Sequence, residues 1–489
     1  MSLKKNFIYS SLLTASNYIF PIIVYPYISR VLGPSNIGIC NFVDSIINYF
    51  TMFAMMGINI IGIREIAALR NNEHKRNTVF TSLLTLNILF TIIAIGLLII
   101  LIFTVPKFQE QPKLLWSGVC KLIFNVMLME WLYKGLENFK YITIRSVCIK
   151  CLYIICVFTL IRKAEDYTLY YFLTALTVAI NAVVNIIFSK SFIKLSYSKK
   201  TTRKLLSPFL TTGLYIILTQ LYLSFNVVFL GFYAPDSEVG YYSSSTRLIS
   251  IILSIYTAWT SVALPRMSAY FQESNMKEFK DLLHKSFILL LTFAFPVIIL
   301  LINYNHEIIR LFLGKDFVGS QIPLYVQTPL IFIIGYSQIL IIQLLMPTKR
   351  DKTLFIISAI GATVCVCANI LLTPTHAAIG SSFSWLISEL IVLTVAIIVS
   401  RNYYDFAFPW REIVKYTLYH APLFIICWTL QKHTLWTVIP SITIGGVIIV
   451  SYTLFLQIYV IKNQFIISLF EKSLSFLVSH KHHENSKHQ

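Results

Sequence analysis

The chain has 489 residues, of which 56% are apolar and only 12% charged, whereas a typical soluble protein carries about 25% charged residues. Its apolar residues suffice for thirteen or fourteen helices of the ~20 residues that span a bilayer. This excludes a soluble enzyme, a soluble nucleic-acid-binding protein and a disordered chain. The formal net charge of +19 needs no nucleic-acid partner, because membrane proteins commonly hold excess Lys and Arg in their cytoplasmic loops.

Apolar stretches of spanning length follow one another along most of the chain. Backbone polar groups inside a bilayer must be satisfied within the segment, so we interpret these stretches as helices. The fourteen predicted spans are residues 7–32, 37–63, 78–105, 114–135, 141–161, 168–189, 207–233, 239–264, 283–304, 322–346, 353–373, 378–400, 413–431 and 436–461. The amphipathic stretch 464–478 is shorter than a span, and we expect it to lie at the membrane interface before a disordered tail.

Basic residues alternate between the predicted loops. With the N terminus inside, 28 of the 40 Lys and Arg residues fall in inner segments, 8 in outer loops and 4 within spans. Because Lys and Arg are enriched in cytoplasmic loops, this bias predicts that both termini are cytoplasmic.

No sequence motif points to catalysis. The sequence contains no phosphate-cradling glycine loop, no nucleophile elbow and no metalloprotease helix. Its eight cysteines fall within predicted spans, where free thiols behave as small apolar residues, so we expect no disulfide, no metal and no cofactor. Membrane glycosyltransferases and polymerases usually carry a large outer loop, and no predicted outer loop is large. We therefore do not expect an enzyme.

Two parts of the chain match each other at a shift of about 202 positions. Gly38 opens the second predicted span and Gly240 the eighth, and each lies 26 residues before an arginine, Arg64 or Arg266. We interpret spans 1–6 and 7–12 as two six-helix bundles in the same orientation, as in transporters with parallel repeats. The predicted domains are residues 1–204 and 205–403 for the two bundles, 404–461 for two additional helices, and 462–489 for the interfacial helix and cytoplasmic tail.

Four stretches carry a resemblance to a known family. They are residues 25–38 (YPYISRVLGPSNIG), 57–67 (GINIIGIREIA), 311–317 (LFLGKDF) and 346–352 (MPTKRDK). In these the chain resembles bacterial polysaccharide exporters, the lipid-linked oligosaccharide flippases of the multidrug/oligosaccharidyl-lipid/polysaccharide transporter superfamily. The resemblance extends over nearly the whole chain. It implies an all-α integral membrane fold of fourteen spans arranged as 6 + 6 + 2, with spans 1, 2, 7 and 8 lining a central cavity.

The resemblance also implies a function. Members move undecaprenyl-diphosphate-linked oligosaccharides from the inner to the outer leaflet of the bacterial cytoplasmic membrane, for O-antigen or capsule synthesis. We expect alternating access driven by an H⁺ or Na⁺ gradient, with a polysaccharide polymerase and a chain-length regulator as partners and no nucleic acid. Two alternatives stay open: a cation-coupled multidrug antiporter of the same superfamily and, less favoured, a membrane polysaccharide polymerase or glycosyltransferase.

Charged residues within spans are the first candidates for a site, because a charge at mid-membrane costs a few kcal/mol unless it faces a cavity or a partner. Asp44 and Arg247 lie six and seven residues after the repeat glycines, ~10 Å below the outer ends of their helices. Arg30 ends span 1 on the same side. We predict that Arg30 and Arg247 bind the substrate diphosphate through paired guanidinium donors, and that Asp44 pairs with Arg247 in the empty cavity. The alternative is a purely structural Asp44–Arg247 pair.

Other candidates have two interpretations each. Amides on the presumed cavity helices suit sugar hydroxyls or interhelical bonds: Asn17, Asn41, Asn48, Gln220 and Asn226. Three tyrosines suit sugar stacking or packing: Tyr18, Tyr222 and Tyr256. The inner ends of the paired helices carry candidates for an inner gate or for lipid-phosphate capture, unless positive-inside anchoring explains their arginines: Arg64, Glu65 and Arg266.

Five further charged residues lie within predicted spans, and we interpret each from its position along its span. Glu130 and Arg145 are expected to form an ordinary interhelical ion pair. Lys121 and Lys150 either face the cavity or extend toward the membrane surface. Glu389 and Asp44 are candidates for coupling to the driving ion.

Overall fold

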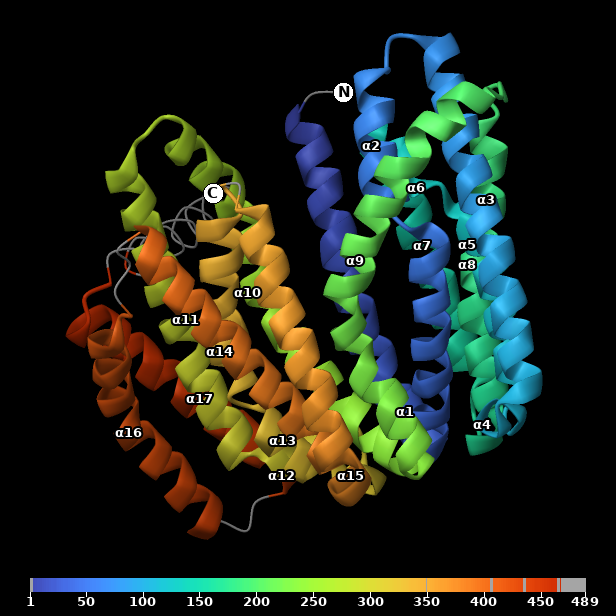
Figure 1. The fold of residues 1–489 in the computed structure, drawn as a ribbon. Helices are drawn as coiled ribbons and strands as arrows, with labels where there is room; N and C mark the ends of the chain where they lie inside the picture. Colours follow the sequence, from blue (N-terminus) through green and yellow to red (C-terminus); the bar gives the residue numbers. More distant parts are fainter. Residues whose placement is uncertain (1–2, 349, 405–407, 434–436, 464–466, 468–489) are drawn as a thin grey trace, which may run out of the picture.

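The computed structural model describes residues 3–348, 350–404, 408–433, 437–463 and 467. Its regular structure is helical throughout these residues (Figure 1). The predicted interfacial helix at 464–478 and the tail that follows lie outside the described residues, apart from residue 467.

The first helix of the structure contains two of the predicted spans. Helix α1 (Leu3–Met55) has 53 residues, or about 80 Å at 1.5 Å per residue, whereas a bilayer core is about 30 Å thick. The helix is interrupted at Gly33, whose φ of 75° and ψ of 173° are readily reached only by glycine. After this reversal the chain continues into α2 (Ile58–Ala68), so spans 1 and 2 are separated by one glycine.

The next six predicted spans are not all single continuous helices. The elements are α3 (Glu73–Thr104), α4 (Pro106–Gln109), α5 (Pro112–Asn125), η1 (Val126–Leu128), α6 (Glu130–Gly135), α7 (Phe139–Leu160), η2 (Ala164–Asp166), α8 (Tyr167–Ser189), α9 (Lys199–Tyr233) and α10 (Asp236–Gln272). Predicted span 114–135 is broken, because Met129 adopts a left-handed conformation with φ 42°. The predicted inner loop 265–282 is mostly helical: α10 continues past Pro265, since a helix end in water needs no apolar residues.

The last part of the chain contains a second reversal. Its elements are α11 (Met276–Asn303), α12 (Asn305–Phe312), η3 (Lys315–Ser320), α13 (Gln321–Gln327), α14 (Leu330–Gln338), η4 (Ile339–Leu345), α15 (Asp351–Tyr404), α16 (Trp410–His433), α17 (Val438–Phe455) and η5 (Leu456–Val460). The predicted span 322–346 is bent by 47° between α13 and α14. Helix α15 reverses at Ala377, whose φ is 45° and ψ −125°, and so contains predicted spans 11 and 12.

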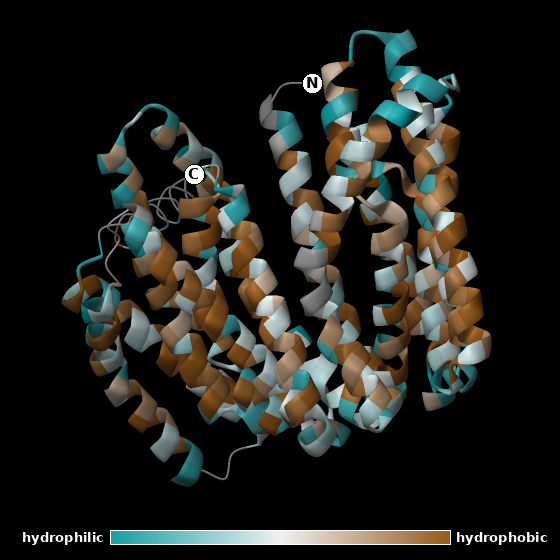
Figure 2. Cartoon of the chain, viewed as in Figure 1, coloured by the Kyte–Doolittle hydropathy of each residue, from teal (hydrophilic) through white to brown (hydrophobic). Residues whose placement is uncertain are grey.

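The protein is an all-α, multi-pass membrane protein. Ten helices of the described chain are long and apolar enough to cross a bilayer, or eleven if the bent pair forms one span. Figure 2 shows hydrophobic residues over the middle of the helices and hydrophilic residues gathered toward their ends. Large apolar side chains on the outside of these helices are exposed, as Ile92 (62%) and Leu371 (73%) are. A lipid environment accounts for such exposure, because lipid tails are as apolar as the side chains themselves.

Helices α1–α8 and most of α9 lie on one side of the molecule, and α10–α17 lie on the other (Figure 1). Helix α9 packs against both groups: Phe209 joins a core cluster with Met56 and Trp131, while Asn226 bonds to Asn369 of α15 at 2.6 Å. The ribbons of the two groups lie closer together at the end opposite the start of α1.

Two glycines bring the backbones of α1 and α10 close together at this end. A Cβ added to Gly38 of α1 would lie 1.8 Å from the carbonyl oxygen of Asp236, and one added to Gly240 of α10 would lie 2.0 Å from that of Pro34. Backbone therefore meets backbone with no room for a side chain. These are the glycines that open spans 2 and 8, at equivalent positions of the predicted repeat.

Candidate functional site

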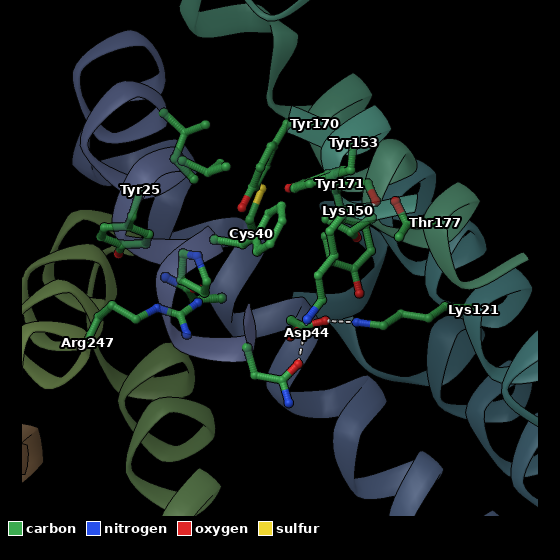
Figure 3. Close-up of a pocket in the computed structure, with 17 residues that line it drawn as sticks. Tyr25, Cys40, Asp44, Lys121, Lys150, Tyr153, Tyr170, Tyr171, Thr177 and Arg247 are labelled. Carbon is green, nitrogen blue, oxygen red and sulfur yellow. Dashed lines mark hydrogen bonds and ion pairs between the residues drawn. The ribbon is translucent and has the colours of Figure 1, made fainter. Parts of the chain in front are cut away.

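A cavity of about 340 Å³ lies where α1, α5, α7, α8 and α10 meet (Figure 3). Both halves of α1 contribute to it, because the reversal at Gly33 brings residues before and after the turn to the same space. Its lining residues are Asn17, Phe20, Pro21, Val24, Tyr25, Ile28, Cys40, Asn41, Asp44, Lys121, Lys150, Tyr153, Tyr170, Tyr171, Thr174, Thr177 and Arg247. Three of these side chains are cationic and one is a carboxylate.

The carboxylate of Asp44 pairs with the Lys121 ammonium across α1 and α5. The expected Asp44–Arg247 pair is therefore wrong in this conformation: the two residues share the cavity, but α5 supplies a closer cation. Lys150 of α7 donates to Ser16 Oγ at 3.0 Å and to Asn17 Oδ1 at 2.5 Å. Both lysines thus face the cavity, the first of the two interpretations that the sequence left open.

Arg247 reaches the cavity from α10, opposite Lys121 (Figure 3). Its guanidinium carbon lies 5.4 Å from the ring centroid of Tyr25, whose hydroxyl is 2.9 Å from Ser244 Oγ. The Arg247 side chain is exposed and makes neither an ion pair nor a hydrogen bond with any residue that the structure describes. Cation–π contact orients a guanidinium while leaving its N–H donors free, so Arg247 is available to an anion.

One wall of the cavity was not foreseen from the sequence. It consists of Tyr153 on α7 and of Tyr170, Tyr171, Thr174 and Thr177 on α8. Residues 170, 174 and 177 have the i, i+4, i+7 spacing that places side chains on one helix face. That polar stripe within a predicted span was the signal that could have identified α8 as a cavity helix.

Two family profiles match the sequence. The one described as “Polysaccharide biosynthesis protein” matches residues 3–271, more than half of the chain, and the one described as “MatE” matches residues 211–372. The chain belongs to the polysaccharide biosynthesis protein family. The resemblance expected from residues 25–38 and 57–67 is thereby confirmed, since both stretches lie within the first match.

Relatives of this polysaccharide biosynthesis protein cover most of its length. A “Putative O-antigen transporter” of Escherichia coli (strain K12) is 24% identical over 407 residues, which is 82% of this chain and 97% of the relative. One of Shigella dysenteriae is 23% identical over 397 residues, 80% and 98% respectively. The lipid II flippase MurJ in its inward closed conformation has the same fold, with a TM-score of 0.74 over 93% of this chain and 100% of that chain at 17% identity. These descriptions name transporters and a flippase rather than enzymes.

In this family member Arg30 does not line the cavity. Its side chain donates to the carbonyl oxygen of Leu311 and packs against Gly314, where an added Cβ would lie 3.0 Å from Arg30 Cγ. The structure thus corrects the expectation that Arg30 and Arg247 form one phosphate site. Arg30 thus joins the end of the first half of α1 to the last turn of α12 and to Gly314 just after it.

The predicted amide residues fall into three groups. Asn17 and Asn41 line the cavity, where Asn41 donates to Ser243 Oγ at 2.8 Å. Asn226 is buried in a network with Tyr242 and Asn369, so its amide bonds between helices instead of facing the cavity. Asn48 is not among the lining residues, and the side chain of Gln220 lies outside the described residues.

The two predicted aromatic residues whose side chains the structure describes, Tyr18 and Tyr256, do not line the cavity. Tyr256 is buried and donates to the carbonyl oxygen of Ser286 at 3.0 Å, which is a packing role. Tyr18 is 37% exposed and is not a lining residue. The side chain of Tyr222 lies outside the described residues.

The remaining charged candidates lie apart from the cavity. Glu130 and Arg145 form the expected ion pair at 2.9 Å, and Glu389 is buried in α15 with 5% exposure. Arg64 pairs with its neighbour Glu65 at 3.0 Å on α2. The gating role of Arg64, Glu65 and Arg266 stays a prediction.

We expect the Asp44–Lys121 pair to behave as one unit. Replacing Lys121→Gln or Asp44→Asn alone leaves a charge partly buried without its partner, whereas the double variant removes both charges. Because the side chains are 17% and 38% exposed, the expected coupling is about 1 kcal/mol, below the value for a fully buried pair. Thermal unfolding of the four proteins in detergent, analysed as a double-mutant cycle, measures it. Additive single effects would show that the pair contributes nothing to stability.

Proposed function

We propose that this protein flips an anionic lipid-linked oligosaccharide, carried on undecaprenyl diphosphate, from the inner to the outer leaflet of the bacterial cytoplasmic membrane by alternating access. The observation that carries the proposal is the charge of the cavity: Lys121, Lys150 and Arg247 face one carboxylate, and Arg247 has no ionic partner among the described residues. The names of the relatives, O-antigen transporter and lipid II flippase, support the same substrate class.

We propose that the chain crosses the membrane fourteen times. With the bent pair counted as one span there are eleven apolar spans, and these become thirteen when α1 and α15 are each divided at their reversals, at Gly33 and Ala377. Helix α9 is the fourteenth. An even number places both chain ends on the same side, and the positive-inside bias makes that side the cytoplasm. The first six and the next six crossings then form two bundles, and the contact of Gly38 with Gly240 joins equivalent helices of the two.

The cavity residues divide the recognition of such a substrate between them. Arg247 offers two parallel N–H donors to phosphate oxygens, while Lys150 adds a compact charge once it leaves its amide and hydroxyl partners. The hydroxyls of Tyr153, Tyr170 and Thr174 offer both donors and acceptors to sugar hydroxyls. The cavity therefore receives the diphosphate on its α10 side and the first sugars on its α8 side.

Ion coupling would act through a carboxylate. Asp44 is one candidate, because it lines the cavity and pairs there with Lys121. Glu389, buried in α15, is the other candidate. The coupling ion, H⁺ or Na⁺, and the partnership with a polymerase and a chain-length regulator remain parts of this proposal.

A multidrug extruder is the second candidate, because residues 211–372 match the MatE profile. Cationic drugs require carboxylates in the cavity, whereas here cations outnumber carboxylates three to one. The charge of the cavity therefore favours the flippase.

Deletion of the gene tests the proposal. We expect surface polysaccharide to disappear and lipid-linked oligosaccharide to accumulate in the membrane fraction, with both restored by the wild-type gene on a plasmid. Sensitivity to a cationic dye such as ethidium is expected to stay unchanged. Intact surface polysaccharide together with raised dye sensitivity would instead establish the extruder.

A further inference from the structure

A second pocket, of about 530 Å³, lies between α10, α11, α16 and the end of the described chain. It is formed by the last turns of α10 and the first turns of α11 and α16, at the end of the molecule where α1 begins. In the proposed orientation this is the cytoplasmic surface of the membrane. The pocket is separate from the cationic cavity and shares no lining residue with it.

Three cationic side chains from three different helices line this pocket: Arg266, Lys285 and Lys415. All three are exposed, and none takes part in an ion pair with the residues that the structure describes. Glu278 and Glu412 also line the pocket, but neither lies within ion-pair distance of these cations. Like charges on separate helices repel, so an anion between them is stabilised.

The pocket also has apolar lining residues, which are less exposed than its cations. Leu282, Ile288 and Leu289 contribute to it, and Trp259 is fixed there because its indole nitrogen donates to Ser286 Oγ at 3.0 Å. Beside the pocket, the outer surface of α16 exposes Val414 by 46% and Leu418 by 66%. Cations beside an apolar surface suit an amphiphile with an anionic head group better than a free anion.

We propose that this pocket binds the phosphate head group of an anionic glycerophospholipid from the cytoplasmic leaflet. Arg266 holds the phosphate through paired donors, and Lys285 and Lys415 add point charges, as basic pockets between helices do at cytoplasmic membrane surfaces. The acyl chains lie along the exposed apolar side of α16. The bound lipid thereby joins α16 to α10 and α11. Only its assignment to the cytoplasmic leaflet rests on the proposed function.

Native mass spectrometry of the purified full-length protein tests this site. With equal amounts of dioleoylphosphatidylglycerol and dioleoylphosphatidylcholine, the wild-type protein should retain the anionic lipid preferentially. The triple variant R266Q/K285Q/K415Q should lower this preference at least fivefold. The matched control is K277Q/K280Q/R411Q, which removes the same number of charges from the first turns of α11 and α16 outside the pocket and should preserve the preference.

Further variants and a competitor test whether the ligand is negatively charged and whether it is a lipid or a free anion. The E278Q/E412Q variant should retain more phosphatidylglycerol, because it removes repulsion. The single variant K415Q should lower the preference about twofold, which keeps the test open if the triple variant fails to fold. Equal retention of both lipids by the wild-type protein, or an equal loss in the control, would overturn the proposal. Displacement of the lipid by sodium phosphate at the same concentration would show a free-anion site instead. None of these measurements depends on transport.

Discussion

Replacing Gly240→Ala is expected to reduce polysaccharide export by about 5- to 150-fold. The new methyl group would lie 2.0 Å from the Pro34 carbonyl oxygen, so α10 must move away from α1 before the chain can accommodate it. Overpacking of this kind costs about 1–3 kcal/mol, which shifts a two-state equilibrium by about 5- to 150-fold. The cost falls on the conformation in which this end of the cavity is closed, so the variant should remain open at the predicted outer surface.

Opening of the cavity toward the outer surface can be measured through the reactivity of a native cysteine, Cys40. Cys40 lines the cavity and is 4% exposed, and we expect a membrane-impermeant maleimide added outside the cell to label it faster in Gly240→Ala. A Gly240→Ala protein that also carries Cys40→Ser identifies the signal. The matched control is Gly96→Ala in α3, where an added Cβ meets nothing within 4 Å; helix propensity predicts no loss there. Export above half of the wild-type rate with unchanged labelling would show that this contact does not close the cavity.

An ionic link supports the same closed end. Lys107 of α4 lies 3.0 Å from Glu110 and 3.3 Å from Asp236 at the start of α10. Burial lowers the pKa of the Lys107 ammonium, but its hydrogen bond to Glu110 and the charge of Asp236 outweigh this and raise the pKa above its ordinary value. The ammonium is therefore charged at neutral pH. Exposed pairs contribute about 0–1 kcal/mol, so the glycine contact dominates.

Replacing Arg247→Gln is expected to lower export by about 10- to 150-fold without destabilising the protein. A hydrogen bond to a charged group contributes about 1.5–3 kcal/mol, and this contribution is lost only when substrate is bound, because Arg247 makes no ion pair with the described residues of the empty protein. Arg247→Lys keeps the charge but not the paired donors, so an intermediate rate is expected. Surface polysaccharide and the thermal midpoint in detergent are the two measurements.

The control for this prediction changes the same residue type elsewhere. Arg401→Gln alters an exposed arginine on α15 and should leave export and stability unchanged. Full export by Arg247→Lys would argue against recognition of phosphate by paired donors. A large fall in the thermal midpoint of Arg247→Gln would instead indicate that the contact with Tyr25 is structural.

The motif at residues 25–38 predicts the family but not the contacts that its residues make. It identified the family, yet its polar members are anchors: Tyr25 bonds to Ser244, Tyr27 donates to the Ile161 carbonyl oxygen at 2.7 Å, and Arg30 donates to that of Leu311. Gly33, within the same motif, is the residue at which the chain reverses. These contacts hold α1 against segments far along the sequence, which residue spacing cannot indicate.

By itself the sequence determined the all-helical membrane class, the approximate position of most helices and the family, because hydropathy and helix length are local properties of the chain. It also marked Gly38 and Gly240 as equivalent before the structure placed them in contact. Only the tertiary structure decided that Asp44 pairs with Lys121 and that α5, α7 and α8 complete the cavity. Lipid is as apolar as a protein core, so the sequence of a spanning helix does not indicate which of its faces contacts lipid and which contacts other helices. The packing of the helices determines how each helix is rotated about its axis.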